Sequence, residues 1–313
     1  MKYGFGVDLG GTTVKIAYFE ETGEMRSKWE IPTNRENGGS QILPDIAASI
    51  AEFCKSWNIP REDLLGIGIG VPGAVSKGVV NCCVNLGWGV VAIEEELMKL
   101  TGLPVKASND ANVAALGEYW KGGGLGCDNV VFVTLGTGVG GGIIVDGKLM
   151  NGAHGSGGEL GHMVLDAKET AVCGCGKRGC VEQYCSATGI VRLAGLRLDK
   201  DQEPSRLREL STITCRDIFD IAKAGDKVAG EILEVYFDYM GQFLGSVCSA
   251  IDPDAVVIGG GVSKAGQVLL DGIAPYFKKY VFHAAYGVKF ALASLGNDAG
   301  AYGAFKLILD ESK

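Results

Sequence analysis

Three cysteines and one histidine stand close together in the stretch HMVLDAKETAVCGCGKRGCVEQY, which runs from residue 162 to 184. They are His162, Cys173, Cys175 and Cys180, and Glu182 follows two residues later. Three thiolates and one imidazole would close the tetrahedral ligand set of a structural zinc site. The spacing is not that of a zinc finger, so on this pattern alone a disulfide or a redox role stays open.

The other cysteines are scattered along the chain. Disulfides are rare in a reducing cytoplasm, so we interpret the isolated cysteines as small buried hydrophobic residues. These are Cys54, Cys82, Cys83, Cys127, Cys215 and Cys248. Cys185 lies beside the cluster, and we do not expect it to be a ligand.

A carboxylate follows two polar residues in SNDANVAALGEYW, where a helix is predicted over 108–120. Asp110 could accept the proton of an attacking hydroxyl as a general base. It could equally cap the helix, as aspartate often does. The residues by themselves leave both roles open.

Two glycine-rich turns share one pattern, in VDLGGTTVK from Val7 and in VTLGTGVGG from Val133. Each joins two predicted strands, which indicates a duplicated unit, although glycine-rich turns also resemble one another by chance. Exposed N–H groups and threonine hydroxyls in such turns can surround phosphate oxygens. Neither is a Walker or a dinucleotide motif, because those lead into a helix.

A third glycine-rich turn lies in AVVIGGGVSKAGQVLL, over 255–270, and leads from a predicted strand into a helix. Gly259, Gly260 and Gly261 would let a ligand approach the main chain and the helix N-terminus.

The chain has 313 residues, with 29 Lys and Arg against 37 Asp and Glu, for a net charge of −8. This length favours two domains. No basic cluster predicts a nucleic-acid surface, and no apolar run is long enough to span a bilayer or serve as a secretion signal. We therefore expect a cytoplasmic protein without nucleic-acid or membrane partners.

Hydrophobic spacing predicts helices over 40–57 and 229–251 and a buried strand over 64–73. Strands that alternate with helices indicate an α/β architecture. The charged segment 196–216 breaks the pattern, and we interpret it as a surface excursion.

Eight motifs occur in order over nearly the whole chain. They are DLGGTTVK at 8–15, GVPG at 70–73, NLGW at 85–88, SNDANVAALGE at 108–118, TLGTGVGGGII at 134–144, GGELGHM at 157–163, CGCGKRGCVEQY at 173–184 and IGGGVS at 258–263. Together they resemble the ROK family of sugar kinases and repressors. The resemblance implies an α/β actin-like ATPase (ribonuclease H-like) fold, with two duplicated lobes and an inter-lobe cleft.

The resemblance also divides the chain. It implies an N-terminal lobe over 1–118, joined by a C-terminal helix at about 298–313, and a C-terminal lobe over 119–297 that carries the zinc motif. Seven residues precede Asp8, so we expect the DNA-binding module of the repressors to be absent.

The implied activity is an ATP-dependent transfer of phosphate to the 6-hydroxyl of glucose, with Mg²⁺ as a cofactor and a homodimer as the assembly. N-acetylmannosamine, N-acetylglucosamine, allose and fructose kinases share most of these motifs, so another hexose stays open. A sugar-sensing regulator without catalysis and an actin-like filament protein are alternatives of other classes.

The resemblance assigns roles to individual residues. Asp110 is the expected catalytic base, and Asp8 is expected to face Mg²⁺ through water. The expected sugar-binding residues are Gly73, Asn85, Asn109, Asp110, Glu159, His162 and Glu182. The expected nucleotide-binding residues are Asp8, Gly10, Gly11, Thr12, Thr134, Gly136, Thr137, Gly138, Gly260 and Gly261. The resemblance implies structural zinc in the cluster, with His162, Cys173, Cys175 and Cys180 as ligands.

Overall fold

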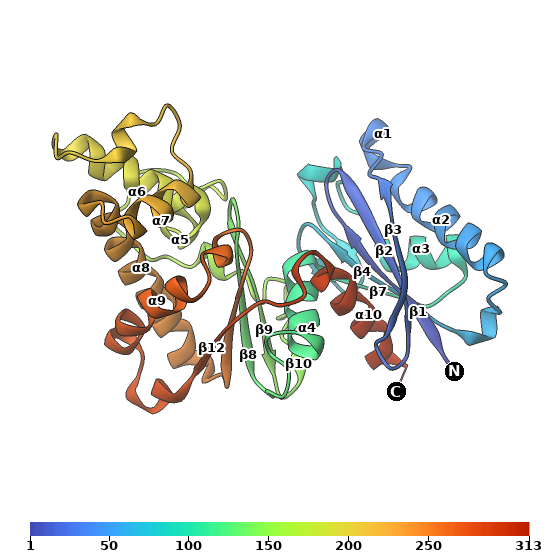
Figure 1. The fold of residues 1–313 in the computed structure, drawn as a ribbon. Helices are drawn as coiled ribbons and strands as arrows, with labels where there is room; N and C mark the ends of the chain where they lie inside the picture. The colour runs from blue at the N-terminus through green and yellow to red at the C-terminus, as the bar shows by residue number, and fades with distance from the viewer. Residues whose placement is uncertain (313) are drawn as a thin grey trace.

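The computed structural model describes residues 1–312 and shows two α/β halves, each built around a twisted sheet (Figure 1). In the described residues, each half has one five-stranded sheet. The α/β architecture expected from the alternating pattern is therefore confirmed.

The first sheet has the order β3-β2-β1-β4-β7. Its strands are β1 (Tyr3–Leu9), β2 (Thr13–Glu20), β3 (Met25–Pro32), β4 (Leu64–Val71) and β7 (Val105–Asn109). The first three are antiparallel, and β4 and β7 run parallel to β1. It follows that β1, β3, β4 and β7 all end at the same edge of the sheet.

The second sheet repeats this build with the order β10-β9-β8-β11-β12. Its strands are β8 (Val130–Leu135), β9 (Val139–Val145), β10 (Lys148–Leu149), β11 (Ala255–Gly259) and β12 (Lys289–Leu292). The hairpin β8–β9 corresponds to β1–β2, and β11 and β12 lie parallel to β8. The duplication predicted from the two glycine-rich turns is confirmed by this shared order.

Helices and a short hairpin connect the strands. The helices are α1 (Glu36–Gly39), α2 (Ile42–Ser56), α3 (Ile93–Thr101), α4 (Asp110–Lys121), α5 (Glu182–Cys185), α6 (Ala187–Lys200), α7 (Cys215–Lys223), α8 (Lys227–Ile251), α9 (Gln267–Tyr280) and α10 (Ala299–Glu311), and the hairpin is β5 (Val75–Ser76) with β6 (Val79–Val80). The predicted helices over 40–57, 108–120 and 229–251 correspond to α2, α4 and α8.

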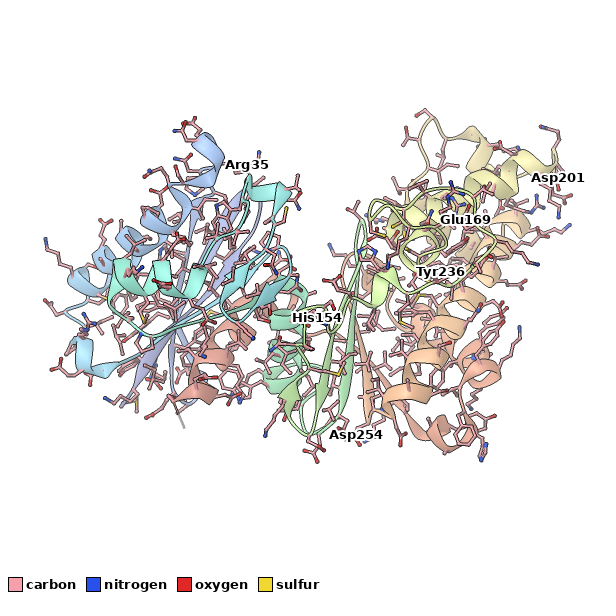
Figure 2. The ribbon with its side chains drawn as sticks, turned by 180° about the vertical axis from the view of Figure 1, so that it is seen from behind. Arg35, His154, Glu169, Asp201, Tyr236 and Asp254 are labelled. Atoms are coloured by element: carbon pink, nitrogen blue, oxygen red, sulfur yellow. The ribbon has the colours of Figure 1, made fainter. Side chains whose placement is uncertain are left out.

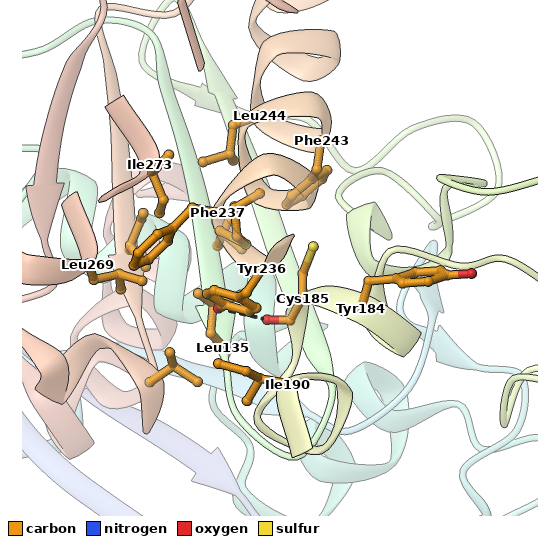
Figure 3. Close-up of a cluster of buried hydrophobic side chains, with 14 of the residues drawn as sticks. Leu135, Tyr184, Cys185, Ile190, Tyr236, Phe237, Phe243, Leu244, Leu269 and Ile273 are labelled. Carbon is orange, nitrogen blue, oxygen red and sulfur yellow. Dashed lines mark hydrogen bonds between the residues drawn. The ribbon is translucent and has the colours of Figure 1, made fainter. Parts of the chain in front are cut away.

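Each half has its own hydrophobic core. In the second half the core gathers around Tyr236 of α8, which is fully buried and donates its hydroxyl to the carbonyl of Cys185, 3.1 Å away (Figure 3). Cys185 is also fully buried, and so belongs to the core. Because Cys185 ends α5, this contact ties the residues after the cysteine cluster to the long helix.

Two helices exchange places between the halves. α4 follows β7 of the first sheet but packs on β8 and β9 of the second, and α10 follows β12 but packs on β1 and β4 (Figure 1). The two helices also pack on each other. The boundary at residue 118 that the sequence suggests therefore falls inside α4.

Two expectations about individual segments need correction. Cys82 is exposed rather than buried, and Cys54, Cys127 and Cys215 are only partly buried. The segment 196–216 is not merely a surface excursion. It contains the end of α6 and the side chain of Leu207, which is 1% exposed because it packs into the core of the second half.

None of the helices within residues 1–312 combines the length and the apolar character that crossing a membrane requires.

Candidate active site

The polar residues of the first half meet where its parallel strands end. The register pairs Asp8 of β1 with Gly70 of β4, and Gly70 with Ser108 of β7. Asp110 follows β7 directly, as the first residue of α4. The sheet therefore brings Asp8, the turn after β4 and Asp110 to one edge.

The start of α4 shows which residue caps the helix, a role that the sequence left open for Asp110. Asn109 is the N-cap, because its Oδ1 accepts the N–H groups of Ala111 at 2.9 Å and Asn112 at 3.2 Å. Asp110 accepts only the Ala111 N–H, at 2.8 Å, and remains exposed. The capping role belongs to Asn109, which leaves most of the Asp110 carboxylate available to a ligand.

The surroundings of Asp110 favour its protonated form. Desolvation by the surrounding protein raises the pKa of this carboxyl above its ordinary 3.8, and the negative charges of Asp8 and Glu159 raise it further. The Ala111 N–H acts in the opposite direction. The residue as a whole nevertheless stays exposed. A raised pKa brings a carboxylate closer to the range in which a general base works well.

Asp8 is held by neighbours from two other elements. Desolvation raises the pKa of Asp8, and Lys15 lowers it from a distance of 3.7 Å between Nζ and Oδ2. On the other side, a Cβ at Gly300 of α10 would lie 2.7 Å from Asp8 Cγ. Glycine at position 300 leaves room for this carboxylate, and no residue pattern around position 300 signals that requirement.

Asn109 is engaged on both sides of its amide. Its Nδ2 donates to the carbonyl of Gly73, 3.1 Å away. The structure therefore joins the turn after β4 to the start of α4. The second Nδ2 hydrogen is available to a ligand, because the amide has two donors.

Asn85 lines a cavity of about 770 Å³ together with Thr33, Asn34 and Arg35. Figure 2 shows Arg35 on the rim of the first half. Thr33 also holds the first glycine-rich turn, because its Oγ1 donates to the Gly10 carbonyl at 2.7 Å and its N–H donates to Thr12. The role of Thr33 was not predicted from the sequence. Thr33 follows β3, whereas the turn that it supports joins β1 to β2.

The two glycine-rich turns are built alike but face different neighbours. The N–H of Gly10 donates to Thr13, and the N–H of Gly136 donates to Gly138. A Cβ at Gly11 would meet only the Asn85 carbonyl, at 3.9 Å, and one at Gly136 would meet nothing within 4 Å. Both turns thus keep open main chain that a phosphate could approach.

Gly138 has a different surrounding from the one expected for a phosphate contact. A Cβ there would lie 2.2 Å from Oε2 of Glu182. The same oxygen accepts the N–H of Val139 at 3.1 Å. Glu182 therefore packs on the second turn, which places a predicted sugar ligand beside predicted phosphate contacts.

The remaining residues predicted to bind the nucleotide also have structural roles. Gly260 has a φ of +84°, and a Cβ there would lie 2.5 Å from the Leu135 carbonyl. Gly261 precedes a short 3₁₀ helix (Val262–Ala265), and α9 begins only at Gln267. Thr134 touches the position of a Cβ at Gly140 with its Cγ2. The turn after β11 thus leads into a 3₁₀ helix first, not directly into α9 as the sequence suggested.

The cysteine cluster comes together as predicted. The ligand atoms of His162, Cys173, Cys175 and Cys180 all lie within 4.8 Å of one another. Cys175 Sγ and Cys180 Sγ are 3.6 Å apart, and His162 Nδ1 is 4.0 Å from Cys173 Sγ. A disulfide would need about 2 Å between sulfurs, whereas tetrahedral Zn–S bonds of about 2.3 Å give an S–S separation of about 3.8 Å. The donor set and its spacing therefore fit zinc.

The loop that carries the cluster is fixed to the second half. Glu169 accepts the Tyr184 hydroxyl at 2.6 Å and also pairs with Arg192 (Figure 2). The Tyr184 hydroxyl, the Ala171 N–H and Arg192 lower the pKa of Glu169 to about 2. Glu182 touches the cluster itself, with Oε1 3.6 Å from Cys173 Sγ.

Two α/β halves with the same strand order, each with a glycine-rich turn in its first hairpin, and an exposed carboxylate at the start of α4 define a protein of the actin-like ATPase fold. The sequence comparisons narrow this class. The model of the ROK family matches residues 4–311, and the chain belongs to this family.

Several relatives cover almost the whole chain. A glucokinase of Halalkalibacterium halodurans is 41% identical over 95% of this chain and 92% of its own length. A glucokinase of Thermotoga maritima is 36% identical over 97% of this chain and 96% of its own. The crystal structure of a ROK family glucokinase from Streptomyces griseus, in complex with glucose and AMPPNP, is 33% identical with a TM-score of 0.75, covering 97% of this chain and 98% of that one.

Proposed function

We propose that this protein is an ATP-dependent hexokinase that phosphorylates the 6-hydroxyl of glucose and yields glucose 6-phosphate and ADP. The observation that carries the proposal is the exposed Asp110 carboxylate, whose pKa is raised and which lies at the sheet edge beside Asp8. The glucokinases among the relatives, one of them a structure with glucose and a nucleotide analogue, support glucose and ATP as the substrates.

In the proposed reaction, Asp110 accepts the proton of the sugar 6-hydroxyl while the oxygen forms a bond to the γ-phosphorus. The bond between that phosphorus and the β,γ-bridging oxygen breaks, and ADP leaves. The open turns at Gly10–Thr12 and Gly136–Gly138 would hold the phosphates with main-chain N–H groups. Most of the work is thus positioning and charge stabilisation, with one proton transfer.

The sugar would be held by groups from both halves. Asn109 offers a free amide hydrogen, and Glu159, His162 and Glu182 offer acceptors and donors from the second half. A hydroxyl with the wrong configuration leaves one of these groups unpaired, which costs about 1–3 kcal/mol when the group is buried. This penalty is the proposed basis of selectivity between hexoses.

Mg²⁺ would be held near Asp8, whose carboxylate supplies the oxygen donor that this ion requires. The ion neutralises charge on the phosphates when it is bound. Lys15 orients the Asp8 carboxylate from one side, and Gly300 leaves it space on the other.

Zinc would be held by His162, Cys173, Cys175 and Cys180, and it would be structural because four protein ligands close the coordination sphere. With Nδ1 facing the cluster, His162 keeps Nε2 for a sugar hydroxyl. The same cluster fixes the position of Glu182.

Three further parts of the expectation remain proposals. They are the division into lobes 1–118 with 298–313 and 119–297, assembly as a homodimer, and a cytoplasmic location.

The test is a substrate panel with the purified protein, ATP and Mg²⁺, in which ADP release is followed for each sugar. We expect the fastest release with glucose, and oxidation of the product by glucose-6-phosphate dehydrogenase would identify the phosphorylated position. N-acetylhexosamines belong in the panel because a related N-acetylgalactosamine kinase is 31% identical. Faster release with an N-acetylhexosamine than with glucose would overturn the proposed substrate.

A further inference from the structure

One buried carboxylate has no part in the proposed chemistry. Glu118 of α4 is fully buried. Its Oε2 accepts the N–H groups of Gly123 at 2.9 Å and Ser294 at 3.0 Å, and its Oε1 accepts that of Leu295 at 2.8 Å. Among residues 1–312 it forms no ion pair within 4 Å. Three N–H donors thus take the place of a cation.

The donors belong to the segment that follows α4 and to the segment that precedes α10. Gly123 lies where the chain leaves α4 for β8 in the second sheet. Ser294 and Leu295 lie where the chain leaves β12 of the second sheet for α10, which packs on the first sheet. One carboxylate therefore joins the end of α4 to the connection in which the chain returns to the first half.

The two helices next to these segments are in backbone contact. A Cβ at Gly117 would lie 2.2 Å from the Ala299 carbonyl, and one at Gly303 would lie 1.6 Å from the Val113 carbonyl. Such close approach brings the backbones of α4 and α10 directly against each other. Glu118 lies at this contact. It accepts hydrogen bonds from the segment that follows α4 and from the segment that precedes α10.

The same helix carries the proposed base. Asp110 begins α4 and Glu118 lies eight residues later, which corresponds to about 12 Å along a helix axis. α10 in turn supplies Gly300, against which Asp8 lies. The position of both carboxylates relative to the second half thus depends on how α4 and α10 are held.

We infer that Glu118 is a positioning residue that clamps the end of α4 to the connection into α10, and so sets where Asp110 stands relative to the phosphate and sugar groups of the second half. The inference rests on the proposed function. Glu118 touches no substrate, so its loss acts on the geometry of the reacting groups and lowers kcat more than it raises KM.

The first test is Glu118→Gln. A glutamine keeps the shape but replaces one acceptor oxygen with a donor, so at least one of the three hydrogen bonds is lost and the remaining ones accept at a neutral amide oxygen. The matched control is Asp226→Asn, because Asp226 also accepts three donors, from Ser205, Arg206 and Ala229, all inside the second half. We expect kcat to fall about 10- to 100-fold in Glu118→Gln with both KM values within about twofold, and the control to keep its kcat.

A second pair of variants removes a donor and keeps the carboxylate. Leu295 has a φ of −82°, which proline can adopt, so Leu295→Pro deletes the N–H that reaches Glu118 Oε1. Leu295→Ala is its control. The clamp predicts a lower kcat in Leu295→Pro than in Leu295→Ala. If Glu118→Gln does not fold, this pair of variants decides whether the clamp exists.

Small-angle scattering gives a readout that does not depend on activity. We expect folded Glu118→Gln to have a larger radius of gyration than the unmodified protein without ligands, and Asp226→Asn to be unchanged. Equal radii together with equal kcat in Glu118→Gln and Asp226→Asn would overturn the clamp. If the unmodified protein phosphorylates no hexose, the proposed function fails, and the scattering comparison still decides on the clamp.

Discussion

The two sheets have the same strand order, but the glycines of each sheet make room for a different helix. In the first half, Gly6 of β1 and Gly68 of β4 leave room for α10, since Cβ atoms there would lie 2.0 Å and 1.6 Å from its carbonyls. In the second half, Gly142 of β9 leaves room for α4, with a Cβ 2.4 Å from Ala115. Each sheet is thus adapted to the helix that comes from the other half.

The halves also differ in what is inserted. The first has only α1 and α2 between β3 and β4, whereas the second has the cysteine cluster and four helices between β10 and β11. The glycine-rich turns differ as well. Thr12 of the first turn corresponds in sequence to Gly138 of the second turn, and Gly138 leaves room for the Glu182 side chain. We infer that the shared build supplies phosphate contacts from both sides, and that the insertion adds the sugar-binding groups to one side.

The largest effect is expected at Asp110, which follows a strand of the first sheet and begins the helix that packs on the second sheet. Asp110→Asn removes the base without changing the shape of the helix start, which Asn109 caps. We expect the variant to fold, with a melting temperature close to that of the unmodified protein, and kcat to fall about 10²- to 10⁴-fold. Near-normal turnover in a steady-state assay would end the assignment of Asp110.

Removing the metal should distinguish the second half from the first. Chelation of zinc, or Cys175→Ser, frees the loop that positions His162 and Glu182. We expect the glucose KM to rise about 10- to 100-fold, with a smaller change in the ATP KM and a lower melting temperature. Metal-free protein with an unchanged glucose KM would show that the insertion does not shape the sugar site. Cys215→Ser is a control, since Cys215 lies outside the cluster.

Two glycines of one turn allow a finer separation. Gly138→Ala pushes on the Glu182 carboxylate, whereas Gly136→Ala enters open space. We expect Gly138→Ala to raise the glucose KM about tenfold through the displaced Glu182, and Gly136→Ala to act on the ATP KM. The same change in both variants would mean that the turn has only one function.

The smallest effect concerns the charges of the two halves around Asp110. Because the pKa of Asp110 is raised, kcat/KM should fall on the acid side with an apparent pKa above the ordinary 3.8 of aspartate. Glu159→Gln removes one negative charge that contributes to this rise, so the acid limb should move to lower pH. Glu36→Gln, at the rim of the first half, should leave it in place; an unmoved limb in Glu159→Gln would show that the halves are not electrostatically coupled.

Much of the fold could be predicted from local patterns. The buried strand over 64–73 and the helices over 40–57 and 229–251 follow from hydrophobic spacing, which depends on near neighbours only. The cysteine cluster was also predictable, since three of its ligands lie within a few residues of one another. Cys82 was misjudged because burial depends on what packs against a residue, and its exposed position in a connecting loop left no trace in residue type.

The sequence by itself determined the two strand hairpins, a helix within 108–120 and the set of zinc-type ligands, because short-range spacing and residue chemistry specify them. The structure also decided that Asn109 rather than Asp110 caps α4, because two neighbouring residues of capping type compete and only the backbone geometry selects one. Only the tertiary structure decided that Gly138 faces Glu182, and that Glu118 joins the end of α4 to the connection into α10. These last two contacts connect segments far apart in the chain. Their existence depends on how closely packed backbones approach one another, and no local pattern encodes that distance.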